Sequence, residues 1–168
     1  KEGYVTMYVC GPTVYNYFHI GNARPFIVFD TFRNYLKHKG YKVKFIQNIT
    51  DVDDKIINKA KEENVSFEEI AKRYTEAYFE DIKKLKIETA DKNPRATEEI
   101  KDMIELIKIL MDKGFAYIID DGVYFNVDKF SDYGKLSNKN LDELKEGARV
   151  EVNSQKKNPL DFALWKFS

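Results

Sequence analysis

The sequence has little that would cross-link the chain or hold it in a membrane. Its 168 residues include one cysteine, Cys10, so no disulfide can form within the chain. The apolar runs are only a few residues long, whereas about 20 apolar residues are needed to cross a bilayer. No apolar segment follows Lys1 and Glu2, as it would in a secretory signal. We therefore expect a cytoplasmic protein with no membrane partner.

The sequence also lacks a net charge, because 28 basic residues balance 28 acidic ones. The balance is uneven along the chain: residues 1–50 hold seven Lys or Arg side chains but only Glu2 and Asp30 as acids. A basic first third could attract phosphate groups. The simpler interpretation is a solvated surface, formed by lysines at a helix end and on an exposed strand: Lys37, Lys39, Lys42 and Lys44.

The first 50 residues predict a strand, a helix and a second strand. Tyr4–Val9 is rich in β-branched and aromatic residues, as strands are. A helical pattern runs from Ala23 to Gly40, and alternation then predicts a strand over 43–49. The helix is expected to bury one stripe: Phe26, Phe29, Phe32 or Arg33, and Leu36. Two strands joined by a helix indicate a βαβ unit with parallel strands, so we expect an α/β fold.

The remaining residues predict helices and a hairpin. Aspartates at 51–54 and a capping box of Ser66 with Glu69 mark the starts of two helices. Asn93-Pro94 indicates a boundary, with Pro94 at the start of another helix. Beyond it we expect an apolar helix ending at Gly114, a hairpin over 115–127 and a short last strand at 162–165.

The most informative segment is the loop from Cys10 to Asn22, which follows the first predicted strand. In an open parallel sheet, ligands bind beyond the carboxyl ends of the strands, and this loop lies there before leading into a helix. A helix N-terminus offers unpaired N–H groups to a phosphate. His19 can donate to an anionic oxygen, Asn22 adds a neutral donor, and Gly21 lets the backbone approach a ligand closely. Because the sequence has neither a Walker motif nor G-x-G-x-x-G, a nucleotide site here must be of another kind.

Several segments together resemble the cysteinyl-tRNA synthetase family. His19–Asn22, between a strand and a helix, looks like the HIGH signature of class I aminoacyl-tRNA synthetases, with Asn22 in place of the second histidine. Flanking and later blocks resemble the cysteinyl version: Met7–Tyr15, Ala23–Phe26, Phe29-Asp30, Asn48–Ile56, Pro94–Thr97, Gly147–Val150 and Asn158–Lys166. The resemblance covers nearly the whole chain. It implies ATP-dependent activation of cysteine to cysteinyl adenylate and transfer of the cysteinyl group to tRNA-Cys.

The resemblance also implies a more detailed fold. Residues 1–93 would be the first half of a Rossmann-like, HUP-type parallel sheet of a class I synthetase. Residues 94–168 would be an incomplete part of the inserted α+β connective-peptide region. The second half of the nucleotide-binding fold, the KMSKS loop and the anticodon-binding domain come later in the family's sequence. We therefore expect the 168 residues alone to be inactive.

The resemblance assigns roles to the residues of the Cys10–Asn22 loop and to Thr50. Cys10 would be a zinc ligand, and Gly11 and Thr50 would contact the substrate cysteine. His19 and Asn22 would be the catalytic pair that stabilises charge at the α-phosphate of ATP, which binds with Mg²⁺. The residues implied to bind ATP are Pro12, Thr13, His19, Gly21 and Asn22.

Zinc has a physical rationale here, although the chain is poor in ligands for it. Serine differs from cysteine by one atom, and pocket shape separates such pairs by only about 10- to 200-fold. A zinc ion with an open position prefers a thiolate to a hydroxyl. Catalytic zinc needs three protein ligands, but the chain has one cysteine and two histidines, of which His19 is assigned to ATP. We expect the chain alone neither to form adenylate nor to hold zinc tightly.

Other interpretations of the same residues remain open. Cys10 could be a small buried hydrophobe, and His38 simply a favourable helix-end residue. Asp51, Asp53 and Asp54 could form a magnesium site, although the helix dipole is a sufficient reason for them. The whole chain could instead be a mycothiol-type cysteine ligase, or a binding module that keeps the fold without the chemistry.

Overall fold

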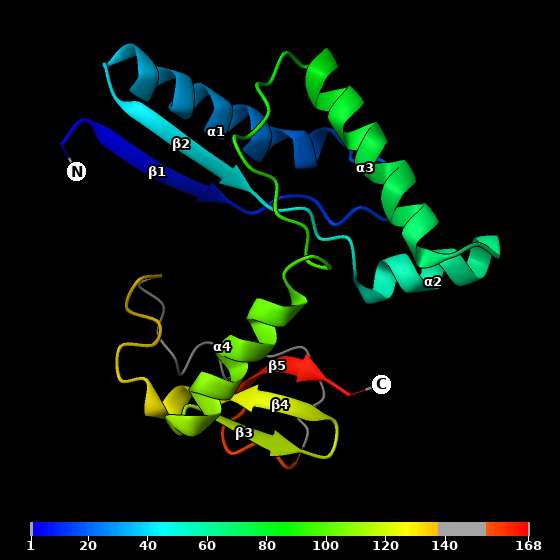
Figure 1. Cartoon of the computed structure of the whole chain (residues 1–168), viewed down its shortest axis with the longest axis vertical. Helices are drawn as coiled ribbons and strands as arrows, with labels where there is room; N and C mark the ends of the chain where they lie inside the picture. Colours follow the sequence, from blue (N-terminus) through cyan, green and yellow to red (C-terminus); the bar gives the residue numbers. More distant parts are fainter. Residues whose placement is uncertain (1, 138–153, 168) are drawn as a thin grey trace. The chain divides into compact units, whose positions relative to one another are not determined.

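The computed structural model describes residues 2–137 and 154–167 and divides the chain into two compact units. The first unit is Lys1–Ile100 and the second is Lys101–Ser168. Both contain helices and strands (Figure 1). The predicted block Gly147–Val150 lies outside the described residues. The functional assignment of residues 1–93 and 94–168 remains a prediction.

The first unit is built on the predicted βαβ arrangement. Strand β1 (Tyr4–Val9) is followed by helix α1 (Ile20–His38) and strand β2 (Lys42–Gln47). The two strands pair in parallel over their whole length, and α1 lies along their sheet (Figure 1). The prediction of an α/β fold with parallel strands is therefore confirmed.

Helix α1 differs from its prediction in where it starts and what it buries. It begins three residues before Ala23, because His19 caps its N-terminus by accepting a hydrogen bond from the Gly21 N–H. The expected stripe of phenylalanines is wrong in part: Phe29 and Phe32 are 37% and 48% exposed. Arg33 is buried in their place, with its guanidinium 4.7 Å from the centre of the Phe45 ring and paired with Asp30.

The segment around Pro94 extends the sheet instead of opening a helix. Isolated parallel bridges join Ile46 to Lys92 and Ile49 to Arg95. The Ile49 N–H donates to the Pro94 carbonyl at 2.8 Å. The predicted helix start at Pro94 is therefore wrong, because this stretch pairs beyond the end of β2, and the next helix begins at Ile100.

Two further helices close the core of the first unit. Helices α2 (Asp54–Glu63) and α3 (Phe67–Lys84) begin where the sequence predicts, capped by Asp53 and Ser66. Their apolar faces pack with residues from the loop, α1 and the chain after β2. The buried cluster comprises Val14, Phe26, Ile49, Ile56, Ala60, Ile70, Ala71, Tyr74, Tyr78 and Ile82. This core supports the loop that follows β1.

Among its described residues, the second unit comprises an α-helix, a short 3-10 helix and an antiparallel sheet. Helix α4 (Ile100–Asp112) precedes strands β3 (Ala116–Ile119), β4 (Gly122–Phe125) and β5 (Phe162–Lys166), which pair in the order β3-β4-β5. A short 3-10 helix, η1 (Val127–Lys129), follows β4. The predicted hairpin and last strand are confirmed, and Gly114 follows α4 with a φ of +74°.

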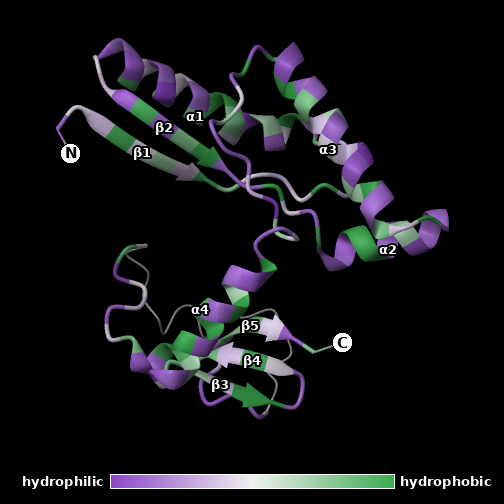
Figure 2. Cartoon of the chain, in the orientation of Figure 1, coloured by the Kyte–Doolittle hydropathy of each residue, from purple (hydrophilic) through white to green (hydrophobic). Residues whose placement is uncertain are grey.

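Hydropathy alternates along the helices and strands of both units (Figure 2). Apolar and polar residues share most elements, as expected for elements with one face on a core. None of the helices in the described parts of the chain is long and apolar enough to cross a membrane.

Candidate functional site

The loop between β1 and α1 forms most of the wall of one pocket. The pocket has a volume of about 500 Å³ and also includes residues from α2 and α3. Its lining is Cys10, Gly11, Pro12, Thr13, Val14, Tyr15, Asn16, Tyr17, Phe18, His19, Gly21, Asn22, Pro25, Phe26, Lys55, Tyr74 and Tyr78. The structure therefore brings together all of the predicted site residues except Thr50, which bonds to this loop from the chain after β2.

Gly11 lies against the backbone that follows β2. A Cβ atom at this position would be 1.6 Å from the Asn48 carbonyl oxygen. The Gly11 N–H donates to the Asn48 Oδ1 at 2.9 Å. No side chain can therefore be added to Gly11 unless the backbones at the ends of β1 and β2 move apart.

Thr50 is held to the loop by its own backbone. It forms an isolated parallel bridge with Thr13. The Val14 N–H donates to the Thr50 carbonyl at 3.2 Å, and the Thr50 N–H donates to the Pro12 carbonyl at 3.0 Å. These bonds extend the β1–β2 pairing into the loop and hold Thr50 beside Pro12 and Val14 of the pocket wall.

Asn48 links Gly11, Thr50 and β1 through its side chain. Its Oδ1 accepts from the Gly11 N–H and from the Tyr8 hydroxyl at 3.0 Å, and its Nδ2 donates to the Thr50 Oγ1 at 3.1 Å. The sequence reasoning gave Asn48 no role. The only available signal was its place at the start of the Asn48–Ile56 block.

His19 and Asn22 form the N-terminal cap of α1. The His19 Nδ1 accepts from the Gly21 N–H at 3.0 Å, and the Asn22 Oδ1 accepts from the His19 N–H at 3.4 Å. A nitrogen that accepts carries no proton, so the hydrogen of the imidazole lies on Nε2. The His19 Nε2–H and the Asn22 amide N–H groups remain able to donate to a ligand.

Gly21 is needed for the position of the His19 ring. A Cβ atom on Gly21 would lie 2.8 Å from Cε1 of the imidazole. A larger residue would therefore push the ring out of its position over the first turn of α1. The predicted role of Gly21, close approach of the backbone to a ligand, remains a prediction.

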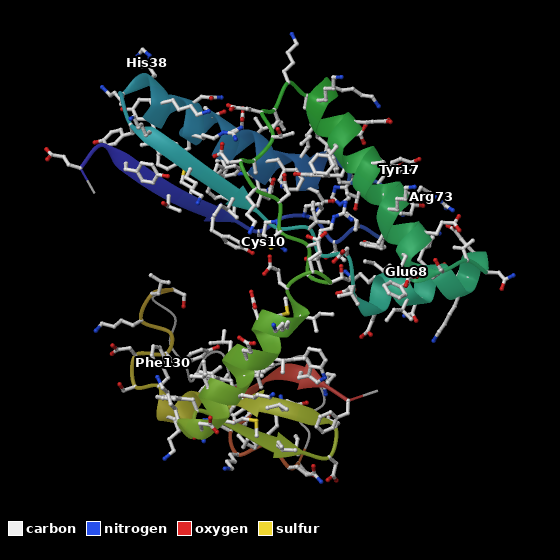
Figure 3. All side chains as sticks on the ribbon, in the orientation of Figure 1. Cys10, Tyr17, His38, Glu68, Arg73 and Phe130 are labelled. Carbon is white, nitrogen blue, oxygen red and sulfur yellow. The ribbon has the colours of Figure 1, made fainter. Side chains whose placement is uncertain are left out.

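Cys10 is exposed at the carboxyl end of β1, where Figure 3 labels it. Its Sγ–H donates to the Gly11 carbonyl at 3.7 Å. Within residues 2–137 and 154–167, no three His, Cys, Asp or Glu side chains gather closely enough to hold a metal. This part of the chain can offer Cys10 as a single thiolate ligand, which is fewer than the three that a catalytic zinc requires.

A second hydrogen-bond chain reaches Cys10 from α3. The Tyr78 hydroxyl donates to the Gln47 Oε1 at 2.8 Å, and the Gln47 Nε2 donates to the Cys10 carbonyl at 3.5 Å. Burial raises the pKa of Tyr78 to about 12. The sequence analysis gave Tyr78 no role and missed this polar contact.

Aromatic rings and one lysine complete the pocket. Tyr17 meets Tyr74 of α3 edge to face with ring centres 5.3 Å apart, and Figure 3 shows Tyr17 beside that helix. The Lys55 Nζ lies 5.2 Å from the centre of the Tyr15 ring. Lys55 is a cation of the pocket wall to which the sequence reasoning gave no role.

The three aspartates after β2 do not form a shared cation site. The buried Asp51 carboxylate accepts from the Thr97 N–H at 3.0 Å and from its hydroxyl at 2.6 Å. Asp53 caps α2 by accepting from the Lys55 N–H. Asp54 lies in the first turn of α2. Two of the acids therefore hold local structure, and the third suits the helix N-terminus.

Comparison with known proteins places this arrangement in a family. The family described as the tRNA synthetases class I (C) catalytic domain matches residues 1–168. The cysteine–tRNA ligase of Finegoldia magna is 59% identical over 99% of this chain, and that of Caldicellulosiruptor saccharolyticus is 57% identical over 99%. The chain spans 36% of the length of each of these relatives.

The fold also matches solved structures. Two structures of Mycobacterium tuberculosis methionyl-tRNA synthetase with methionyl-adenylate give TM-scores of 0.60 and 0.62 at 22% and 21% identity. They cover 68% and 74% of this chain, and 22% and 24% of theirs. The predicted class I synthetase fold is thereby confirmed. Together with the family match over residues 1–168, these results show that the chain belongs to the class I (C) tRNA synthetase catalytic-domain family.

Proposed function

We propose that this chain supplies the cysteine-activating pocket of a cysteine–tRNA ligase. The reaction joins cysteine to ATP as cysteinyl adenylate with release of pyrophosphate, and then transfers the cysteinyl group to tRNA-Cys in the cytoplasm. The observation that carries the proposal is one pocket, at the carboxyl ends of two parallel strands, that contains Cys10, Gly11 and the His19–Asn22 cap. The names of the relatives support cysteine as the amino acid.

The ATP half of the proposed site is the N-terminus of α1. The helix dipole places a partial positive charge at this end, and this charge attracts phosphate oxygens. His19 and Asn22 direct the Nε2–H and amide donors toward the negative charge that develops at the α-phosphate. Pro12, Thr13 and Gly21 form the wall against which the nucleotide and its Mg²⁺ bind. Positioning and charge stabilisation are sufficient for this step, which needs no protein nucleophile.

The amino-acid half of the proposed site lies between the ends of β1 and β2. Gly11 and Thr50 contact the substrate cysteine. Cys10 is one ligand of a zinc ion whose other ligands lie outside the described residues. In this scheme residues 1–93 belong to the nucleotide-binding half, and residues 94–168 to the connective peptide.

The proposal is tested in a chimera in which this chain replaces the matching 36% of the Finegoldia magna ligase. We expect cysteine-dependent exchange of pyrophosphate into ATP, with no exchange when serine replaces cysteine. His19→Ala in the chimera is expected to lower the exchange rate at least about 100-fold, because it removes one donor to the α-phosphate. The 168 residues alone are expected to give no exchange.

Two results would contradict the proposal. One is a chimera that folds, with a melting temperature close to that of the Finegoldia magna ligase, but activates no cysteine. The other is an unchanged exchange rate in the His19→Ala chimera. Exchange by the 168 residues alone would show instead that the pocket needs no further part of the ligase.

A further inference from the structure

The orientation of the Asn48 side chain is determined by its neighbours. The backbone N–H of Gly11 can only donate, so the Asn48 atom 2.9 Å away must be the amide oxygen. The Tyr8 hydroxyl reaches the same oxygen at 3.0 Å and supplies its second hydrogen bond. The amide nitrogen therefore faces Thr50, and the two ends of the amide cannot be exchanged.

This orientation controls which role the Thr50 hydroxyl can play. The Asn48 Nδ2 donates to the Thr50 Oγ1 at 3.1 Å, so one lone pair of the hydroxyl is occupied. A hydroxyl has one hydrogen to donate, and the amide nitrogen facing it cannot accept that hydrogen. The Thr50 O–H is thus left to donate to an acceptor other than Asn48.

We propose that Asn48 is a positioning residue for the amino-acid substrate, which it serves through Thr50 and Gly11. It makes the Thr50 hydroxyl a hydrogen-bond donor toward an oxygen of the bound amino acid, and it holds the Gly11 backbone beside that oxygen. This inference rests on the proposed function, since it takes an amino acid as the ligand between the ends of β1 and β2. The inference adds Asn48, which does not itself line the pocket, to the residues of the amino-acid site.

The discriminating variant is Asn48→Asp, which keeps the shape of the side chain and reverses its polarity toward Thr50. A carboxylate still accepts from the Gly11 N–H and the Tyr8 hydroxyl. It also accepts the Thr50 O–H, and thereby withdraws that hydrogen from the substrate. In the chimera we expect the KM for cysteine in pyrophosphate exchange to rise about tenfold, with the KM for ATP unchanged.

Two further variants separate positioning from structural support. Tyr8→Phe removes a bond to the same Asn48 oxygen without touching Thr50, so the KM for cysteine should change less than about twofold. Thr50→Val removes the hydroxyl through which Asn48 acts. The double variant Asn48→Asp, Thr50→Val should therefore have the same KM for cysteine as Thr50→Val alone.

The possible outcomes distinguish the two proposals. If the unmodified chimera shows no cysteine-dependent exchange, the proposed function fails, and the role of Asn48 fails with it. If the chimera is active but Asn48→Asp leaves the KM for cysteine unchanged, only the role of Asn48 is overturned. Equal rises in the KM values for cysteine and ATP would also overturn it, because they indicate a general structural effect.

Asn48→Ala keeps the proposal testable if Asn48→Asp does not fold. It removes the donor to the Thr50 Oγ1 but adds no acceptor that could take the Thr50 hydrogen. The rise in the KM for cysteine should therefore be smaller than tenfold but larger than in Tyr8→Phe. A KM for cysteine equal to that of Tyr8→Phe would overturn the inference.

Discussion

Each unit of the chain gathers polar groups around one side chain, Asn48 in the first unit and Asp161 in the second. Asp161 is 1% exposed. Its two oxygens accept from the Tyr117 hydroxyl at 2.6 Å, the Val127 N–H at 2.9 Å and the Asn158 N–H at 3.0 Å. These bonds tie the segment that leads into β5 to the β3–β4 hairpin. These hydrogen bonds of the Asp161 carboxylate therefore stabilise the fold of the second unit.

Asn48 uses its side chain differently. It holds the loop that lines the pocket, and it donates to the Thr50 hydroxyl. The Thr50 hydrogen is therefore not donated to Asn48. A network whose polar groups all bond to one another adds stability. A network beside a pocket that has a donor left over can use that donor to bind a ligand. Asp161 therefore serves the fold of the second unit, whereas the role proposed for Asn48 is in binding.

The largest expected effect comes from Gly11→Ala. The added Cβ would lie 1.6 Å from the Asn48 carbonyl oxygen, and this clash with the backbone cannot be relieved by a side-chain rotation. We expect a loss of about 3 kcal/mol or more in the free energy of unfolding, measured by urea denaturation, and loss of cysteine-dependent exchange.

Gly21→Ala is the matched control for this prediction. Its Cβ would meet only the movable His19 ring, at 2.8 Å from Cε1. The free energy of unfolding should change by less than about 1 kcal/mol, while the KM for ATP should rise because the ring is displaced. Equal destabilisation by Gly11→Ala and Gly21→Ala would show that the contact with Asn48 does not explain Gly11.

Asp161→Ala should have the next largest effect, confined to stability. It leaves two backbone N–H groups and the Tyr117 hydroxyl without their acceptor, so the free energy of unfolding should fall by about 2–4 kcal/mol. Hydrogen exchange of the β4 and β5 amides should become faster. In the folded fraction of the chimera the KM for cysteine should stay unchanged, and a tenfold rise, like that expected for Asn48→Asp, would break the distinction between the two networks.

The smallest expected effect is that of Tyr78→Phe. It removes the donor to the Gln47 Oε1, so the free energy of unfolding should fall by about 1–2 kcal/mol at pH 7. Burial raises the pKa of Tyr78 to about 12, above its ordinary value of 10.0, so the folded state favours the neutral phenol. The stability from Tyr78 is complete below pH 10 and is lost as the pH rises through 12.

The measurement for Tyr78 is the difference in stability between the native chain and Tyr78→Phe as a function of pH. This difference should shrink between pH 10 and pH 12. Tyr117→Phe is the counterpart in the second unit, because burial and the bond to Asp161 raise the pKa of Tyr117 to about 12 as well. A difference for Tyr78→Phe that stays constant up to pH 12 would contradict the burial of the Tyr78 hydroxyl.

Local patterns in the sequence were enough to predict most of the elements. Alternation and capping residues predicted β1, β2, α2, α3 and the β3–β4 hairpin, because these signals depend on neighbours a few residues apart. Pro94 was misassigned because a proline in an extended segment and one at a helix start look alike locally. Its pairing with Ile49 is a contact between residues far apart in the sequence.

Arg33 and His19 show the same limit within α1. The sequence left open whether Phe32 or Arg33 belongs to the buried stripe, and Arg33 is the buried one; only the fold places the Glu88 and Thr89 carbonyls and the Phe45 ring around it. His19 is an unusual N-cap, so the helix start was placed too late.

The sequence by itself determined the family, the parallel βαβ unit and the loop from Cys10 to Asn22 as the candidate site, since these follow from residue types in a local order. Only the tertiary structure decided that Gly11 packs on Asn48, that Asn48 bonds to Thr50, and that Tyr78 reaches Cys10 through Gln47. These contacts join β1, β2 and α3, whose side chains meet only after the core of the first unit has packed. Hydrogen bonds depend on distance and direction in space, and neither is contained in the spacing of residues along the chain.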